Sequence, residues 1–406
     1  MTVEIRPAGD LETGFPQMQA VLAVAFGDEA TDDNEDRGVI EMDRAVLAWD
    51  GVQAVGCAAA FSFDLSLPGG SVPTAALSWV GVLPTHRRRG IMTALLADRH
   101  RAALAAGQPV AALWASQSEI YPRFGYGVGA RSLSVRVPRT VGLMRTPDTT
   151  DVTVTIVPSA EDAALTRPVY QAARTVRPGM PVLDDRWHAR SVLDRTEDRS
   201  GGSPLRTFVA SRAGAPVAYA RFRQHHDWST GIGDGSVRVA EQLAVEPAGA
   251  AAVWGQLHEL ESMTSTWAWN LALDDPLLPW LSEVRRVKLR MREQLYLRLL
   301  DLPAALTART YRAELDVVLD VTDRDLPDNA GRWRLSAGPS GATCTRTTAP
   351  ADLAVDVRGL GAALLGSTTL RQLAAAGDVT ENRSGSLEQA SLAFEHPVAA
   401  WCPIVF

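Results

Sequence analysis

A short basic segment carries the clearest chemical signal in the chain. In VGVLPTHRRRGI, residues 80–91, Arg87 and Gly90 are spaced as R-x-x-G. Pro84 lacks an N–H and ends the strand-like alternation before it. Positions at helical spacing follow: Ile91, Leu95, Leu96 and His100. The first N–H groups of such a helix point out of its end, beside three arginines, so the segment suits a pyrophosphate.

This segment resembles motif A of the GCN5-related N-acetyltransferases, whose turn holds the pyrophosphate of acetyl-CoA. The resemblance implies acetyl-CoA as co-substrate, with the preceding strand paired to its pantetheine arm. One position departs, because Met92 stands where the family has a small residue. The alternative is a solvated basic turn or a nucleic-acid patch. An isolated basic run would not need a strand, Pro84 and Gly90 in register.

Composition predicts a globular protein of two to four domains. The chain has 406 residues, of which 46% are hydrophobic and 21% charged. Its apolar runs are too short to cross a bilayer. The first residues, MTVEIRPAGDLE, include acids and do not resemble a signal peptide. We therefore expect a cytoplasmic location and no membrane span.

Charge and cysteine usage narrow the partners. The net charge of -7 disfavours nucleic acid as a partner. Cys57, Cys344 and Cys402 lie far apart without a histidine cluster, so we expect packing residues, no disulfide and no metal. Eight carboxylates gather over residues 28–43. This segment is either a solvated loop or a source of negative potential for a cationic substrate.

Residues 1–145 alternate between strands and helices. The patterns predict a helix over 11–26 and strands over 45–49, 52–65, 110–115 and 132–138, in addition to the basic segment and its helix. Between the last two strands, SEIYPRFGYGVG reads as a glycine-rich loop. Its G-x-G-x-G run lacks the βαβ surroundings of a dinucleotide site, so we do not interpret it as one.

Residues 146–300 then repeat part of this pattern. The segment 207–224 resembles 45–62, and 241–262 resembles the basic segment with its helix. In that alignment Leu243, Val245 and Pro247 replace Val80, Val82 and Pro84. The three arginines become Ala250, Ala251 and Ala252. Chance similarity is the alternative, but the shared proline favours duplication, with the phosphate site lost from the second copy.

Residues 301–406 predict a third, α+β unit. Strands are expected over 313–321, 333–337 and 353–357, and short helices over 360–365 and 370–376. The chain ends in VAAWCPIVF, which is apolar to Phe406. A chain end usually frays in water, so we expect this one to be buried. It is either a strand of the third core or a carboxylate delivered into an active site.

The whole chain resembles the Eis (enhanced intracellular survival) family of N-acetyltransferases. The matching segments are LSWVGVLPTHRRRG, ASQSEIYPRFGYG and the aromatic C-terminal residue. The resemblance implies a mixed α/β and α+β fold: two tandem GCN5-related acetyltransferase domains, the second degenerate, followed by a sterol-carrier-like domain. It also implies a homo-oligomer, namely a hexamer.

By the same resemblance, Tyr121 is the general acid that protonates the coenzyme A thiolate, and the Phe406 α-carboxylate is the general base. Tyr126 is the rival for the acid. Backbone N–H groups of the strand at Val80 and Val82 would polarise the acetyl carbonyl. The implied coenzyme contacts are Val80, Gly81, Val82, Arg87, Arg88, Arg89, Gly90, Ile91, Met92, Thr93, Ser116 and Gln117.

The resemblance also implies an amine pocket. Phe26 and Asp28 match its aromatic and acidic residues, and Asp33, Glu35 and Asp36 would add negative potential. Val405 departs from the pattern, since relatives have an acid before the terminal aromatic. The implied substrates are cationic amines: an aminoglycoside, a polyamine or a lysine side chain.

Two other classes of function compete with acetyl transfer. A lipid or sterol carrier would rest on the third domain and would bind an acyl chain without turnover. A nucleic-acid-associated regulator would rest on HRRRG, and the acidic pI of about 5.6 argues against it.

Overall fold

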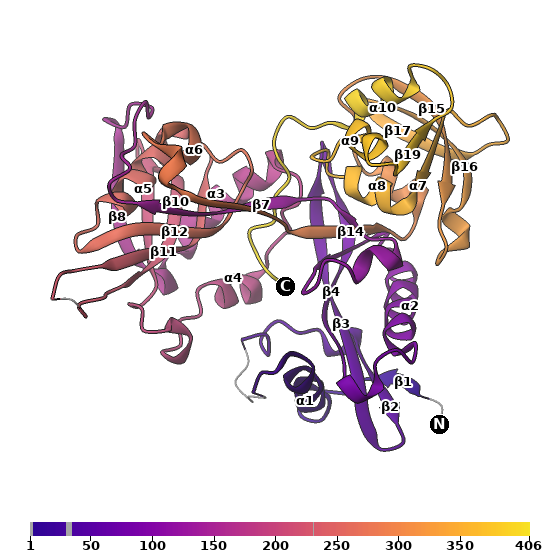
Figure 1. The fold of residues 1–406 in the computed structure, drawn as a ribbon, viewed down its shortest axis with the longest axis horizontal. Coiled ribbons are helices and arrows are strands. Elements are labelled where there is room, and N and C mark those ends of the chain that lie inside the picture. Colours follow the sequence, from indigo (N-terminus) through magenta and orange to yellow (C-terminus); the bar gives the residue numbers. More distant parts are fainter. Residues whose placement is uncertain (1–2, 30–34, 230) are drawn as a thin grey trace.

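The computed structural model describes residues 3–29, 35–229 and 231–406, and these form three mixed β-sheets with helices against them (Figure 1). In spatial order, the strands of the first sheet are β1 (Glu4–Pro7), β2 (Ala45–Asp50), β3 (Gln53–Leu67), β4 (Gly70–Val82), β5 (Val110–Trp114), β14 (Leu295–Leu299) and β6 (Gly127–Val128). Its helices are α1 (Gly14–Phe26) and α2 (Ile91–Ala105).

The second sheet repeats this plan. In spatial order its strands are β13 (Lys288–Glu293), β7 (Arg131–Pro138), β12 (Met263–Leu271), β11 (Gly235–Ala244), β10 (Ala215–His225), β9 (Arg206–Arg212) and β8 (Val152–Pro158). Its helices are α3 (Ala163–Val176), α4 (Asp185–Ser191), α5 (Pro247–Glu259) and α6 (Leu277–Trp280).

The third sheet is smaller. Its strands, in spatial order, are β17 (Gly341–Arg346), β16 (Gly331–Gly338), β15 (Leu315–Thr322), β18 (Leu353–Asp356) and β19 (Val379–Glu381). Its helices are α7 (Leu302–Thr307), α8 (Val357–Ala363), α9 (Leu370–Ala375) and α10 (Ser386–Phe394). The prediction of two similar units followed by an α+β unit is confirmed. Within the described ranges, no helix has the length and apolarity to cross a membrane.

One predicted placement is wrong. We assigned the strand over 132–138 to the first unit, whereas β7 pairs with β12 and β13 in the second sheet. Conversely, β14 falls within residues 146–300, which we assigned to the second unit, but it pairs with β5 and β6 in the first sheet. Periodicity identifies a strand but does not indicate which sheet the strand joins, so the sequence pattern could not predict this exchange.

Small residues allow the two helices of the first unit to approach β3 and β4 closely. A Cβ on Gly81 would lie 2.6 Å from Leu22 of α1, and one on Gly56 would lie 3.2 Å from Ile91 of α2. Gly56 pairs with Val82, next to Gly81, so the two glycines point to opposite faces. The strand that ends at Val82 is therefore held between both helices.

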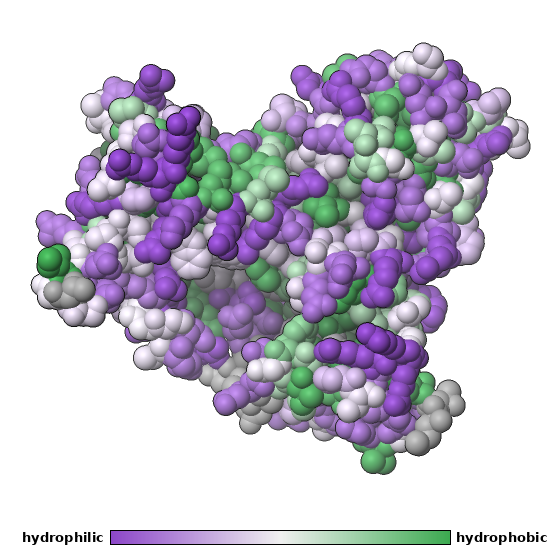
Figure 2. All heavy atoms as spheres, viewed as in Figure 1, coloured by the Kyte–Doolittle hydropathy of each residue, from purple (hydrophilic) through white to green (hydrophobic). Residues whose placement is uncertain are grey.

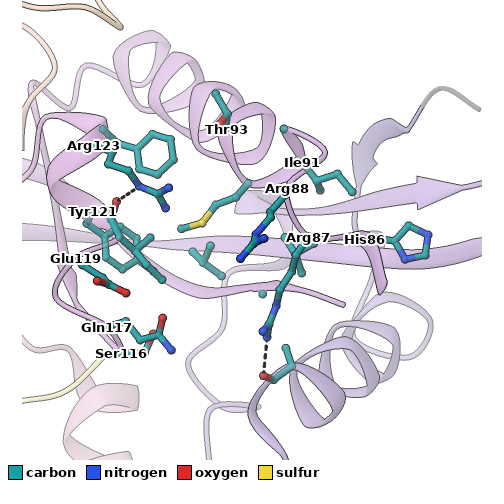
Figure 3. Close-up of a pocket in the computed structure, with 18 of the residues that line it drawn as sticks. His86, Arg87, Arg88, Ile91, Thr93, Ser116, Gln117, Glu119, Tyr121 and Arg123 are labelled. Carbon is teal, nitrogen blue, oxygen red and sulfur yellow. Dashed lines mark hydrogen bonds between the residues drawn. The ribbon is translucent and has the colours of Figure 1, made fainter. Parts of the chain in front are cut away.

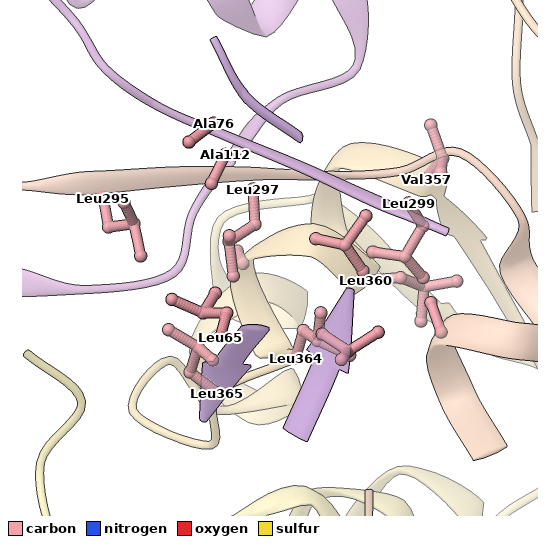
Figure 4. Close-up of a cluster of buried hydrophobic side chains, with 14 of the residues drawn as sticks. Leu65, Ala76, Ala112, Leu295, Leu297, Leu299, Val357, Leu360, Leu364 and Leu365 are labelled. Carbon is pink, nitrogen blue, oxygen red and sulfur yellow. The ribbon is translucent and has the colours of Figure 1, made fainter. Parts of the chain in front are cut away.

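The third unit is packed against the first sheet through α8 (Figure 4). Leu295, Leu297 and Leu299 of β14 are fully buried and share one core with Leu360 and Leu364 of the third unit. Two glycines bring backbone against backbone here. A Cβ on Gly127 would lie 2.0 Å from the carbonyl oxygen of Arg358, and one on Gly361 would lie 2.3 Å from that of Leu297.

We expect Gly361→Ala to lower the free energy of unfolding, because its methyl group must displace α8 from β14. Overpacking of this kind typically costs about 1–3 kcal/mol. Gly255→Ala is the matched control, since Gly255 lies within α5 with no atom within 4 Å of the added Cβ. That change should stabilise the helix slightly. Thermal unfolding of both variants tests this, and equal melting temperatures would contradict the close packing.

Candidate active site

A β-bulge separates β4 from β5 and opens the site. β4 pairs in parallel with β5 from Thr74 to Leu77. The bulge lies just beyond, in the pairing of β4 with β3, where Ser78 is opposite Ala59 and the next pair is Gly81 opposite Cys57. Trp79 within the bulge has φ 55°, in the left-handed region that non-glycine residues rarely adopt. A bulge bends its strand, so β4 turns away from β5.

Side chains around Trp79 stabilise this unusual conformation. Its indole N–H donates to Asp36 Oδ2 at 2.9 Å, and its ring packs 4.9 Å from that of Phe15. The Cys57 thiol donates to its carbonyl oxygen at 3.1 Å. Backbone strain of this kind persists when the surroundings determine it, and it is frequent at functional sites.

A cavity of about 470 Å³ lies between the diverging strands (Figure 3). It is lined by residues from the end of β4, the basic turn, the start of α2 and the loop after β5. Of the predicted coenzyme contacts, those lining it are Val80, Gly81, Val82, Arg87, Arg88, Gly90, Ile91, Met92, Thr93, Ser116 and Gln117. The structure thus brings together eleven of the twelve residues, and Arg89 is the exception.

The basic turn adopts the geometry of an anion site. Pro84 begins a short 3-10 turn, and α2 begins at Ile91, as the sequence predicts. Arg88 and Gly90 have φ values of 63° and 78°. N–H groups of a turn can be directed into an anion-binding concavity, and this turn lies at the positive end of a 15-residue helix.

The three arginines differ in placement. Arg87 and Arg88 line the cavity, and the Arg87 guanidinium also donates to the carbonyl oxygen of Ala25 at 3.2 Å. The Arg89 side chain is 55% exposed and lies 3.9 Å from Asp50. The spacing R-x-x-G could not distinguish these directions, because it does not specify the backbone angle at Arg88.

Tyr121 lies in the wall of the cavity opposite the basic turn (Figure 3). It begins a 3-10 turn that Gly125 ends with φ 78°, and the guanidinium of the buried Arg298 occupies the space behind Gly125. Burial raises the pKa of Tyr121 to about 12. The hydroxyl is therefore protonated at neutral pH and can donate a proton.

Tyr126 has a different environment. It is fully buried, and its hydroxyl lies 2.8 Å from His100 Nε2. Burial also lowers the pKa of His100 to about 3, so the imidazole is neutral. Tyr126 is not among the residues that line the cavity, and its hydroxyl has a structural partner.

The predicted amine-pocket residues are dispersed. Phe26 lines the cavity and is 53% exposed, and Asp28 follows α1 on the surface. Asp33 lies outside the described residues. Glu35 and Asp36 are both paired with Arg190, at 2.8 and 2.6 Å, so this one guanidinium compensates part of their charge. Asp36 also accepts from the indole of Trp79.

Phe406 is buried, but it is not among the residues lining the cavity. It is 7% exposed, and its ring lies 5.6 Å from that of Phe63. Arg190, which holds Glu35 and Asp36, also donates to the carbonyl oxygen of Val405 at 3.2 Å. One guanidinium therefore links the acidic segment to the end of the chain.

The sequence analysis missed several residues of the cavity wall. These are Ala25, His86, Glu119, Ile120, Arg123 and Phe124. Glu119 is the notable one, because it adds a carboxylate on the same loop as Tyr121. Its position two residues before the proposed acid, in SEIYPRF, was a signal that could have found it.

Comparisons with known proteins agree with this geometry. Family models match at residues 4–129 and 179–299, each described as an acetyltransferase (GNAT) domain, and at residues 302–403, described as a sterol carrier protein domain. An uncharacterized N-acetyltransferase of Streptomyces avermitilis is 42% identical over 387 residues, covering 94% of this chain and 95% of the relative. N-acetyltransferase Eis of Mycobacterium tuberculosis is 32% identical over 411 residues, covering 95% and 96%.

Solved structures extend the similarity to the complete fold. The crystal structure of Eis1 from Mycobacterium abscessus matches with a TM-score of 0.84 at 28% identity, and both chains are covered completely. A GCN5-related N-acetyltransferase from Anabaena variabilis shares the fold with a TM-score of 0.86 at 18% identity, again over both complete chains.

Proposed function

Because the chain belongs to the Eis-like GNAT N-acetyltransferases, we propose that it transfers an acetyl group from acetyl-CoA to a primary amine of a cationic substrate. An aminoglycoside, a polyamine and a lysine side chain are the candidate acceptors. The observation that carries the proposal is the cavity of about 470 Å³, which joins an anion-binding turn to Tyr121. The basic turn on one wall suits the phosphates of a thioester coenzyme, and Tyr121 on the other wall suits its thioester.

The coenzyme would bind along the cavity. Free N–H groups at the start of α2, with Arg87 and Arg88, would hold the pyrophosphate. Backbone groups of Val80 and Val82 would pair with the pantetheine arm, since β4 has turned away from β5 there. This arrangement would place the thioester near the bulge, where a strand N–H can polarise the acetyl carbonyl.

The reaction would proceed by direct attack. The neutral amine attacks the carbonyl carbon, the new C–N bond forms, and the C–S bond breaks. Tyr121 gives its proton to the leaving thiolate, and the proton that the attacking nitrogen loses as the amide forms returns to Tyr121 through water. The substrate ammonium must first lose a proton to a base, because a protonated amine has no lone pair for attack.

Two carboxylates are candidates for that base. The Phe406 α-carboxylate is our first assignment, supported by its burial and by the Arg190 contact at the adjacent residue. Glu119 is the alternative, supported by its place in the cavity wall. Glu119→Gln separates them, since it removes a base while keeping the size of the side chain.

A thiol-release assay tests the proposed function. Acetyl-CoA would be incubated with polyamines, aminoglycosides and lysine peptides, and released coenzyme A thiol would be measured against N-acetylated product by mass spectrometry. We expect product with at least one polycation. Failure with every acceptor, together with binding of an acyl chain, would instead support a lipid or sterol carrier.

We expect one molecule of acetyl-CoA to bind per chain. In the second unit, Glu246 precedes α5 and Pro247 is its first residue, so a carboxylate replaces the anion site and one N–H is missing. Calorimetric titration gives the stoichiometry directly. Two sites per chain would contradict the loss of the second phosphate site.

Arg88→Ala should weaken acetyl-CoA binding. Loss of a charge-assisted hydrogen bond costs ~1.5–3 kcal/mol, which corresponds to roughly 10- to 150-fold in Kd. Arg89→Ala is the matched control, because the Arg89 side chain is exposed and outside the cavity wall. Calorimetry should show a small change for Arg89→Ala, and equal losses in both variants would contradict the assignment of Arg88 to the phosphate.

A hexameric assembly and a cytoplasmic location also stay predictions that follow from the family resemblance and the sequence. Sedimentation of the purified protein would test the first.

A further inference from the structure

The second unit has a β-bulge at the position where β4 diverges from β5 in the first unit, although its own phosphate site has changed. The β10–β11 register shifts between Phe222, opposite Val239, and Arg221, opposite Glu241. The parallel pairing of β11 with β12 runs as far as Val239 and Ala268. When Val239 is aligned with Ser78, the residue before each bulge, Leu243 takes the place of Val82, where the sequence comparison had placed Val245.

A cleft follows this second bulge. Its cavity of about 300 Å³ is lined by residues 242–247 from the end of β11 and the start of α5, and by residues 272 and 274–276 after β12. Trp401 from the C-terminal segment also lines it. The side chain of Trp401 is 2% exposed and belongs to one buried cluster with Leu243 and Ala272.

Hydrogen bonds hold the backbone of the C-terminal segment beside this cleft. The Gln294 side chain accepts from the Cys402 N–H and donates to the Cys402 carbonyl oxygen, both at 2.8 Å. Asn270 on β12 donates to the same oxygen at 3.1 Å and accepts from the Trp401 indole at 3.1 Å. The two amides are joined at 2.6 Å and are 4% and 1% exposed.

An ion pair holds the segment at the mouth of the cleft. Arg177 and Asp274 pair at 2.7 Å. Arg177 donates to the Ala399 carbonyl oxygen at 2.6 Å, and Asp274 accepts from the Ala399 N–H at 2.9 Å. These contacts come from the second unit, although the segment follows α10 of the third, which contributes Ser367 as acceptor for the Ala400 N–H at 2.6 Å.

We propose that the second unit, beside this cleft, forms a binding site for the chain's own C-terminal segment, residues 398–404, and that Asn270 and Gln294 are positioning residues for Phe406. In Figure 1 the segment leaves the third unit, crosses to the second, and ends between the first and second sheets. Figure 2 shows a recess in this region of the molecule. The second unit thus holds a peptide beside the cleft that corresponds to the proposed coenzyme cavity of the first unit.

The functional part of this inference rests on the proposed role of the Phe406 carboxylate, and the structural part does not. Trp401 and Cys402 are held by hydrogen bonds to Asn270 and Gln294, and only three residues separate Cys402 from the terminal Phe406. Their freedom is small, so the place of the terminal carboxylate follows from these hydrogen bonds. The buried amides fix this register through the backbone of Cys402 and through the indole of Trp401.

The test compares Gln294→Met and Asp274→Ala with wild-type protein. Gln294→Met removes both hydrogen bonds to Cys402. Asp274→Ala removes the partly exposed contact to Ala399, and we expect this second variant to fold with less loss of stability. Gln224→Leu is the control, a half-buried glutamine on β10 of the same unit. Digestion with carboxypeptidase, followed by mass spectrometry, measures release of Phe406 and Val405.

We expect release to be at least tenfold faster in both variants than in the wild type and the control. Coenzyme affinity should stay unchanged, and kcat should fall at least tenfold with little change in the KM for acetyl-CoA. Wild-type release rates in both variants would overturn the binding site. Fast release with wild-type kcat would support the binding site and refute the Phe406 carboxylate as base.

Discussion

Tyr121→Phe is expected to lower kcat by roughly 10²- to 10⁴-fold while acetyl-CoA affinity stays nearly unchanged. The change removes one hydroxyl and keeps the ring, so the cavity wall keeps its shape. Without that proton the coenzyme A thiolate must leave as an anion from a largely buried site. Single-turnover kinetics with calorimetric measurement of the coenzyme Kd would separate chemistry from binding.

Tyr126→Phe is the matched control for this experiment. It removes the hydroxyl that lies 2.8 Å from His100 in the core, so we expect a loss of stability with turnover near the wild-type value. Near-normal turnover in Tyr121→Phe, together with a large loss in Tyr126→Phe, would reassign the general acid.

The pH profile gives a second test of the same residue. Burial raises the pKa of Tyr121 to about 12, so the acid is protonated at every lower pH. A lysine-like amine loses its proton near about pH 10.4. The rate should therefore rise with pH as the amine is deprotonated, and it should fall again as Tyr121 ionises. A decline centred near neutral pH would exclude Tyr121 as the acid.

Adding residues after Phe406 is expected to abolish acetyl transfer with coenzyme binding retained. The extension converts the α-carboxylate to a neutral amide and must be accommodated where Phe406 is 7% exposed. If that carboxylate is the base, the loss of kcat should reach roughly 10²-fold or more. Turnover, coenzyme affinity and melting temperature would be compared in chains with a free and an extended end.

The same extension placed before the N-terminus serves as the control. A fall in melting temperature that parallels the loss of turnover would point to a structural role for the chain end. Full activity with the C-terminal extension would exclude the carboxylate, and Glu119→Gln would then be expected to show the loss.

The local chemistry of the coenzyme site could be predicted from sequence because it depends on neighbouring residues. Pro84, Gly90 and the helix beginning at Ile91 lie within one turn of each other, so type and spacing determine their geometry. The preference for Tyr121 over Tyr126 came instead from the family resemblance. The sequence comparison placed the loss of the second phosphate site at Ala250, Ala251 and Ala252, which lie within α5 and not in the turn before it.

Long-range partners could not be predicted in this way. Asp36 was expected to face a substrate, but it is paired with Arg190, which lies 154 positions later in the chain. The strand exchange has the same cause, because edge pairing depends on the other unit. Composition revealed the acidic segment, and it could not reveal that a distant arginine would compensate part of its charge.

The exchange of β7 and β14 has a consequence for how the chain is made. β14 lies between β5 and β6 in the first sheet, so that sheet lacks an internal strand until residue 299 has been synthesised. Until then β5 presents an unpaired apolar edge, which is a site of misassociation in a nascent chain. The first unit thus completes its fold after the second unit has been synthesised, although it is the first to be translated.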